Sequence, residues 1–201
     1  MQHKESTNNL DHDLTLGDLS LGIILTAIML ITRSHHLASI HHLPDASWAI
    51  FFLAGFYFKD SLVLFSMCAI AILVDYVAIT WGGVSSFCIS SAYLLLLPTY
   101  ALLWASGRGY AYLHKDSWST LPLLAVIVII ATLGAELVSS ASFYFLSGRF
   151  TTPNWVNFQP RLLEYFPYSL SNMALYISTA AMVHGLFIWH YPKPIAIQSS
   201  I

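Results

Sequence analysis

The sequence predicts an all-α, polytopic membrane protein with six transmembrane helices. Of its 201 residues, 57% are hydrophobic and only 9% are charged, and the mean hydropathy is +0.66. Soluble domains usually carry about 25% charged residues, so this composition excludes an ordinary soluble domain. A bilayer core of about 30 Å needs roughly 20 apolar residues per helix, and several stretches of the chain meet or approach that length.

Six apolar stretches are expected to form the helices. Four have about the length of a full span, at 62–80, 90–106, 120–147 and 165–190. Two shorter stretches, at 17–32 and 46–58, complete a crossing only with the help of polar flanks or neighbouring helices. The last stretch is rich in Ser, Ala and Gly, which permits close helix packing, and is expected to be central. Because no repeat or long linker divides the chain, residues 1–201 are expected to form a single integral membrane domain.

The basic residues indicate which ends of the helices face the cytoplasm. With the amino terminus inside, the inner segments hold five of the eight basic residues and the outer segments hold three. An excess of Lys and Arg is typical of cytoplasmic loops, so this orientation is favoured. The three outer basic residues are all arginines: Arg33, Arg149 and Arg161. Arginine suits fixed recognition of polar or anionic groups, so the outer face is the expected functional face.

The outer segments are expected at 33–45, 81–89 and 148–161. In the third, Pro153 and Pro160 should stop a helix. The first 18 residues contain neither a basic region nor a small-residue cleavage site, so no cleaved signal peptide is expected. The net charge of −2 and the lack of Lys/Arg runs exclude a nucleic-acid partner from the expected functions.

The two cysteines have different surroundings in the sequence. Cys68 lies inside an apolar stretch, where a thiol packs as a small hydrophobic group with little reactivity. Cys88 lies at the edge of a stretch, in the run WGGVSSFCI at 81–89. A thiol next to water can ionise and act as a nucleophile or as a soft metal ligand, or it can be an incidental small residue. Neither cysteine is expected to form a disulfide.

Two carboxylic acids fall within apolar stretches. Asp75 lies near the end of the third stretch, where an uncompensated carboxylate costs about 2.5 to 3.5 kcal/mol at bilayer depth. It is expected either to accept hydrogen bonds from a polar ligand or to tie helices together. Glu136 lies deep in the fifth stretch, where proton coupling and a hydrogen bond to a neighbouring serine are both open.

Histidines are concentrated in the first outer segment. They lie at His35, His36, His41 and His42. This spacing does not match a recognised zinc motif, although paired imidazoles bind Zn, Ni or Co. Two further histidines near the end of the last helix, His184 and His190, are expected to be structural or interfacial.

Five polar positions carry a resemblance to a known family. They are His36, Asp75 in LVDYVAITWGG, Cys88 and Tyr93 in SSFCISSAY, and Arg161 in FQPRLLEY. The chain resembles the BtuM family of small bacterial vitamin B12 transporters, which are related to the substrate-binding S-components of energy-coupling factor (ECF) transporters. The resemblance covers essentially the whole chain. It implies an S-component-like six-helix bundle in the bacterial cytoplasmic (inner) membrane, with a pocket that opens outwards.

The resemblance also implies how a substrate is held. Cys88 would ligate the cobalt of cobalamin, and His36, Asp75, Tyr93 and Arg161 would line or support the corrinoid pocket. Thiolate is a strong donor for cobalt. By taking the lower axial position it would displace the dimethylbenzimidazole base, giving base-off cobalamin, and would promote loss of cyanide from cyanocobalamin. The expected function is therefore cobalamin uptake, with decyanation as an accompanying catalytic activity of Cys88.

The first helix departs from the pattern of S-components. These proteins usually carry small residues four apart on this helix for docking on a shared transmembrane subunit. Here only Gly22 and Thr26 have that spacing. A standard ECF-type energising module is therefore in doubt as a partner, and the sequence leaves the energy source open.

Three other functions compete with cobalamin transport. A Ni or Co ion permease would use the four loop histidines together with Cys88, whereas a corrinoid brings four equatorial nitrogens and needs chiefly Cys88. A haem-binding or redox subunit could also use a thiolate ligand. In a non-catalytic scaffold, Asp75 and Arg161 would only tie helices together.

Overall fold

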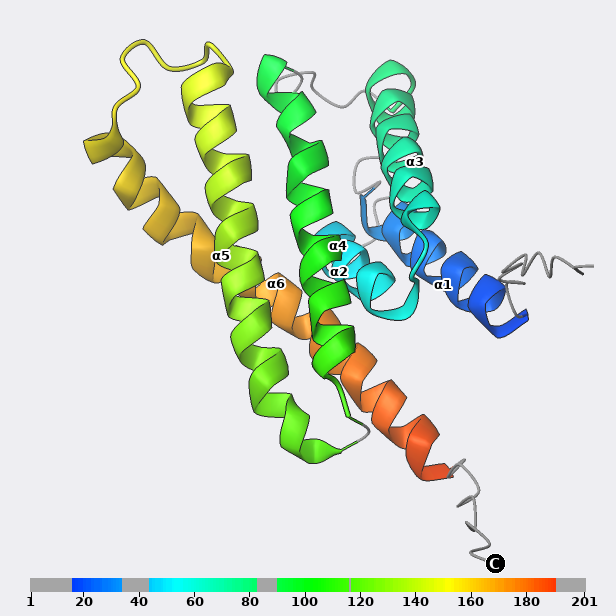
Figure 1. Cartoon of the computed structure of the whole chain (residues 1–201). Coiled ribbons are helices and arrows are strands. Elements are labelled where there is room, and N and C mark those ends of the chain that lie inside the picture. Colours follow the sequence, from blue (N-terminus) through cyan, green and yellow to red (C-terminus); the bar gives the residue numbers. More distant parts are fainter. Residues whose placement is uncertain (1–15, 34–43, 83–89, 116, 191–201) are drawn as a thin grey trace, which may run out of the picture.

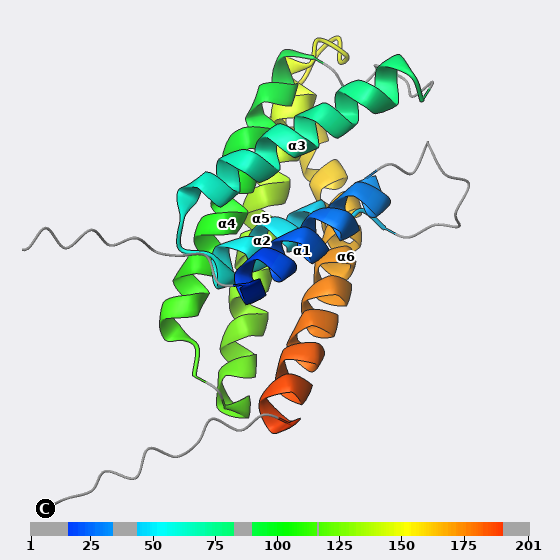
Figure 2. The same ribbon diagram turned by 90° about the vertical axis from the view of Figure 1, so that its right-hand side faces the viewer.

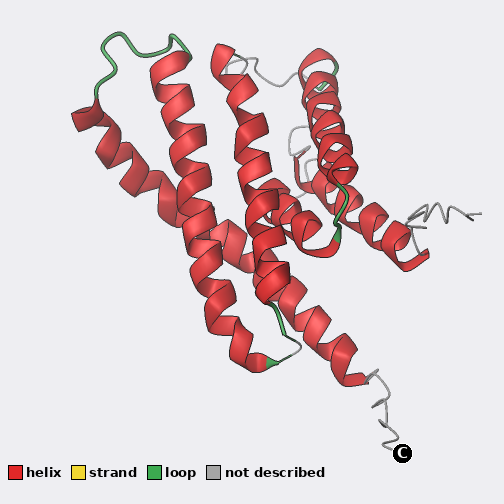
Figure 3. Cartoon of the chain, in the orientation of Figure 1, coloured by secondary structure: helices red, strands yellow, loops and turns green. Residues whose placement is uncertain are grey.

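A computed structural model of the chain describes residues 16–33, 44–82, 90–115 and 117–190, in which all regular structure is helical (Figures 1 and 3). The α-helices are α1 (Leu16–Arg33), α2 (Ser47–Tyr57), α3 (Ser61–Thr80), α4 (Leu96–Leu113), α5 (Leu121–Leu146) and α6 (Trp155–His190). Two short 3₁₀ helices, η2 (Ser91–Leu95) and η3 (Trp118–Thr120), precede α4 and α5. The prediction of an all-α chain is confirmed.

Among the described residues, three helical segments are long and apolar enough to cross a membrane. They are Leu16–Arg33, Ser61–Thr80 and Trp118–Leu146. The helix α2 is apolar but has only 11 residues, or about 16 Å of helix. This length is well short of a bilayer core of about 30 Å.

The helix α6 begins at Trp155 rather than at 165, and the predicted stop at Pro160 is wrong. Asn154 caps the helix, because its side-chain oxygen accepts a hydrogen bond from the backbone N–H of Asn157 at 2.9 Å. Phe158, in the first turn, is buried with its ring centroid 5.6 Å from that of Tyr144. The cap and this packing stabilise the first turns, so the helix continues through Pro160.

The helix α4 continues past the expected end at 106, to Leu113. Gly107 does not end the helix because α2 packs directly on it. A Cβ atom at Gly107 would lie 1.9 Å from the backbone oxygen of Phe52, and one at Gly55 would lie 1.9 Å from the backbone oxygen of Trp104. The backbones of the two helices are therefore in contact, an arrangement that only glycine permits at these two positions.

The short helix α2 lies in the middle of the bundle. Figure 1 shows α4 and α5 side by side, α6 crossing them obliquely, and α1 and α3 on the other side of α2; Figure 2 shows the steep tilt of α1 and α3. Deeply buried side chains of the main core lie on α2 and on the helices packed around it: Met29, Ile50, Phe51, Phe52, Leu103 and Met173. In Figure 1, α2 ends well above the turn that joins α4 to α5.

Candidate functional site

Asp75 and four other polar side chains form one hydrogen-bonded network, which we call the Asp75 cluster. The Arg33 guanidinium donates two hydrogen bonds to the Asp75 carboxylate, from Nε to Oδ1 at 2.7 Å and from Nη2 to Oδ2 at 2.6 Å. The Tyr93 hydroxyl donates to Asp75 Oδ2 at 2.6 Å. Arg33 Nη1 donates to Ser47 Oγ at 3.0 Å and to the Tyr100 hydroxyl at 2.8 Å.

The cluster compensates the charge of Asp75 at the end of an apolar helix. Arg33 is the last residue of α1 and meets the carboxylate in a bidentate geometry, which is the strong form of this pair. The side chains are mostly buried, with 10% of Arg33 and 21% of Asp75 exposed. Asp75 therefore has the helix-tying contacts that the scaffold alternative requires. It also lies beside Tyr93, the neighbour that the family resemblance implies.

The cluster also brings together residues that flank two connecting segments in the sequence. Arg33 directly precedes residues 34–43, and Ser47 follows them closely. Nearby, Asp45 accepts hydrogen bonds from the backbone N–H and the hydroxyl of Ser47, at 2.9 Å and 2.6 Å. Asp75 lies on the last turns of α3 before residues 83–89, and Tyr93 lies in η2 after them. Described residues from both sides of each segment thus belong to one hydrogen-bonded network.

The remaining predicted residues of this region belong to those two segments. His36, together with His35, His41 and His42, falls in 34–43, and Cys88 falls in 83–89. These positions lie outside the described residues. Their roles therefore stay predictions.

Arg161 lies in a different cluster, on the first turns of α6. Its guanidinium carbon is 5.0 Å from the ring centroid of Phe150, 5.3 Å from that of Tyr165 and 5.8 Å from that of Tyr144. These distances are typical of cation–π contacts. Figure 1 shows the start of α6 and α3 on opposite sides of α4 and α5. The structure therefore brings Asp75 and Tyr93 together but holds Arg161 apart from them.

Glu136 has the serine partners that the sequence left unnamed. The Ser169 hydroxyl, on α6, donates to Glu136 Oε2 at 2.5 Å, and the Ser140 hydroxyl, one turn along α5, donates to Oε1. Only 4% of Glu136 is exposed. The hydrogen bond from Ser169 joins α5 to α6, and the one from Ser140 occupies the other carboxyl oxygen.

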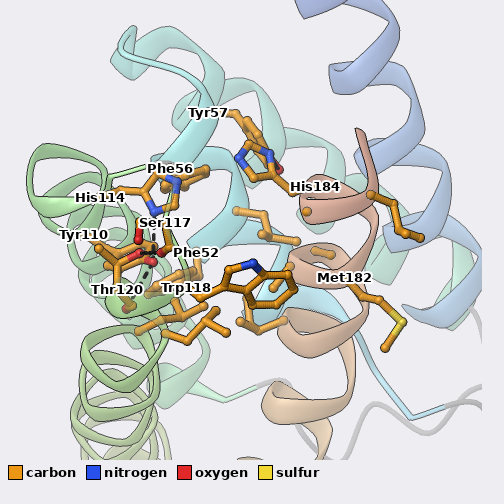
Figure 4. Close-up of a pocket in the computed structure, with 18 residues that line it drawn as sticks. Phe52, Phe56, Tyr57, Tyr110, His114, Ser117, Trp118, Thr120, Met182 and His184 are labelled. Carbon is orange, nitrogen blue, oxygen red and sulfur yellow. Dashed lines mark hydrogen bonds between the residues drawn. The ribbon is translucent and has the colours of Figure 1, made fainter. Parts of the chain in front are cut away.

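A cavity of about 580 Å³ lies near the turn between α4 and α5 (Figure 4). Its walls come from the last turns of α2, from η3 with the start of α5, and from the second half of α6. Aromatic rings and two histidines dominate the lining: Phe52, Phe56, Tyr110, His114, Trp118 and His184. No pattern in the sequence predicts this cavity, because it arises where the short α2 ends and leaves this end of the bundle without an inner helix.

The two histidines of the cavity are in contact with tyrosine hydroxyls. The Tyr57 hydroxyl lies 3.2 Å from His184 Nδ1, and the Tyr110 hydroxyl lies 3.0 Å from His114 Nδ1. Within the described part of the chain, no group of three or more His, Cys, Asp or Glu side chains is arranged to hold a metal ion. Any metal site at this cavity therefore has at most two histidine ligands from these residues.

Comparison of the sequence with protein-family models and with curated proteins finds no match in either. The resemblance to the BtuM family is thus carried by the five polar positions alone. Of these, Asp75, Tyr93 and Arg161 lie within the described residues.

Proposed function

We propose that the chain is a vitamin B12 uptake protein of the BtuM type in the bacterial cytoplasmic membrane. In this proposal all six helices lie in the bilayer, the amino terminus is cytoplasmic, and cobalamin enters from the periplasmic side. The observation that supports it most is the Asp75 cluster. This network joins described residues that flank the two segments in the sequence: Arg33 and Ser47 flank the segment with His36, and Asp75 and Tyr93 flank the segment with Cys88. In the proposed complex both segments contribute to one substrate site.

In the proposed complex, Cys88 supplies the lower axial ligand of the cobalt. A corrin ring already provides four equatorial nitrogens, so one soft donor from the protein completes the binding of the metal. The dimethylbenzimidazole base is then displaced, and the substrate is bound base-off. When the substrate is cyanocobalamin, electron donation from sulfur weakens the cobalt–carbon bond on the opposite face. Cyanide leaves with the bonding electron pair, and cobalt stays in its oxidation state.

The other residues of the proposed site act on the periphery of the substrate. Both carboxylate oxygens of Asp75 accept a hydrogen bond from Arg33, and one also accepts from the Tyr93 hydroxyl. In the proposed site, the role of Asp75 is therefore to orient the Tyr93 hydroxyl and the residues that flank the segments with His36 and Cys88. Tyr93 and His36 would bind the amide groups of the corrin ring. Arg161 would bind amides or the phosphate of the displaced tail, in keeping with the preference of arginine for planar acceptors.

Base-off binding predicts that the chain does not need the nucleotide base of its substrate. We expect titration calorimetry of the detergent-purified protein to give dissociation constants for cobinamide and cobalamin within about threefold of each other, or roughly 0.7 kcal/mol. Cobinamide keeps the cobalt and the corrin ring but lacks the base. Binding of cobalamin without any binding of cobinamide would contradict the proposal. Binding of neither corrinoid, together with Ni²⁺ or Co²⁺ binding that requires the four loop histidines, would favour the ion permease.

A further inference from the structure

His114 and His184 bring two imidazole rings together at the cavity. His114 caps the end of α4 and His184 lies on α6, so the two rings come from elements 70 residues apart in the sequence. Their ring centroids are 5.7 Å apart, with an angle of 67° between the planes. Figure 4 shows both rings at the end of the cavity that Phe56 and Tyr57 occupy.

This separation matches two imidazoles that share one metal ion. Metal–nitrogen bonds to histidine are about 2.0 to 2.1 Å long, which places the centroids of two rings on the same ion roughly 5 to 6.5 Å apart for bond angles between tetrahedral and linear. The observed value lies inside that range. The Nε2 atoms of both rings are buried, so they face the interior of the bundle and not bulk solvent.

Hydrogen bonds on the other ring nitrogen favour the tautomer that a metal requires. The Tyr110 hydroxyl donates to the backbone oxygen of Thr120 at 3.5 Å, which leaves its oxygen to accept a hydrogen bond from His114 Nδ1–H at 3.0 Å. The lone pair of His114 is then on Nε2. The Tyr57 hydroxyl lies 3.2 Å from His184 Nδ1, and in the proposed site it accepts a hydrogen bond from Nδ1–H, so that Nε2 of His184 carries the lone pair. Metal-ligating histidines almost always donate their second N–H in this way, and such partners orient the ring.

Aromatic packing holds both rings in place. Phe56 meets His114 edge-on at 5.2 Å and His184 edge-on at 6.0 Å between ring centroids. Phe56 lies on α2, so three separate helices determine where the two imidazoles lie. A site whose ligands are fixed before binding loses less conformational entropy when the ion arrives.

We propose that His114 and His184 form a binding site for a divalent transition-metal ion of the Zn²⁺ or Ni²⁺ class. Imidazole is a preferred ligand of these ions and not of Mg²⁺ or Ca²⁺. The two histidines supply two coordination positions, and water or a small chelator in the cavity of about 580 Å³ supplies the others. A bound ion links the end of α4 to the second half of α6. This site is separate from the proposed cobalamin site, because α2 lies between the Asp75 cluster and the cavity.

The test measures Ni²⁺ binding by equilibrium dialysis of the full chain, purified without a histidine tag. His35, His36, His41 and His42 are first replaced by glutamine to remove the loop histidines. In this background we expect one Ni²⁺ per chain. His114→Gln and His184→Gln should each weaken binding at least tenfold. His190→Gln, an exposed histidine on α6, should leave it unchanged.

A second variant separates a loss of the ligand from a loss of the fold. Tyr57→Phe keeps every ring but removes the hydroxyl at His184 Nδ1, and we expect it to weaken Ni²⁺ binding about tenfold. Saturating Ni²⁺ should raise the melting temperature of the background protein but not that of the His114→Gln variant. The proposal is overturned if the background protein retains no Ni²⁺. It is also overturned if the His114→Gln, His184→Gln and Tyr57→Phe proteins bind Ni²⁺ as tightly as the background protein does. Because cobalamin binding is measured on its own, either proposal can fail while the other stands.

Discussion

Replacement of Gly107 by alanine is expected to destabilise the protein strongly, although it adds only one methyl group. The new Cβ would lie 1.9 Å from the backbone oxygen of Phe52 and 3.1 Å from the backbone nitrogen of Phe56. Backbone atoms cannot rotate out of the way as a side chain can, so α2 must move off α4. Overpacking of a core costs typically 1 to 3 kcal/mol, and we expect about 3 kcal/mol or more here.

The same helix provides a matched control for this substitution. Gly109 has no atom within 4 Å of an added Cβ. Gly109→Ala should therefore keep the stability of the parent or raise it by up to about 1 kcal/mol, because alanine is the better helix former. The measurement is reversible unfolding in mixed detergent micelles, followed by circular dichroism. Equal stability of the Gly107→Ala and Gly109→Ala proteins would contradict the contact between the backbones of α2 and α4.

The second large effect is expected from removal of Arg33. In an Arg33→Leu protein the Asp75 carboxylate keeps the hydroxyl of Tyr93 but loses its cationic partner, Arg33. Breaking a buried ion pair on one side costs about 3 to 5 kcal/mol. We expect about 3 kcal/mol, the lower end, because 21% of the Asp75 side chain is exposed.

A double substitution shows whether the loss of stability in the Arg33→Leu protein comes from the Asp75 carboxylate that is left without its cationic partner. Leucine at both Arg33 and Asp75 removes the pair together, so this protein should be more stable than the Arg33→Leu protein by about 1 kcal/mol or more. Unfolding of the parent, both single variants and the double variant in the same micelles gives the coupling energy. Additive effects of the two changes would mean that the pair does not stabilise the bundle.

Much of the fold can be predicted from the sequence because the apolar stretches are long and well separated. The expected stretches at 17–32 and 62–80 differ by one residue at most from each end of α1 and α3. The start of α6 was predicted wrongly because Pro160 was expected to stop a helix. Pro160 can lie inside a helix whose first turn is capped by Asn154 and packed through Phe158. A proline in the sequence does not show whether a cap and tertiary packing will stabilise the helix around it.

The predicted site residues depend on pairings that hydropathy does not reveal. Asp75 and Tyr93 lie together, but Arg33, which the sequence analysis counted only as an outer cation, is the residue that binds Asp75 most strongly. An acidic group in an apolar helix and an arginine at the same expected depth could have been paired in advance. The pairing of His114 with His184 had no such signal. It depends on the oblique course of α6 and on the place where α2 ends.

The helix α2 connects these findings, because its two ends face different parts of the molecule. Ser47, at its start, belongs to the Asp75 cluster, and Phe51 stacks on Tyr100 of that cluster with 4.1 Å between ring centroids. Phe52 and Phe56 line the cavity. A shift of α2 against α4 would change both regions together. The glycine contact at Gly107 therefore bears on the Asp75 cluster and on the cavity as well as on stability.

The absorption spectrum of the purified protein incubated with cyanocobalamin tests the central claim most directly. It compares the parent with Cys88→Ala and with Cys68→Ala, in which a buried thiol of α3 is removed as the control. The parent and the Cys68→Ala protein should both convert the corrinoid to a base-off, sulfur-ligated spectrum, and the Cys88→Ala protein should not. If the Cys88→Ala protein gives the same shift as the parent, or if no protein shifts the spectrum, the account of Cys88 as the cobalt ligand is contradicted.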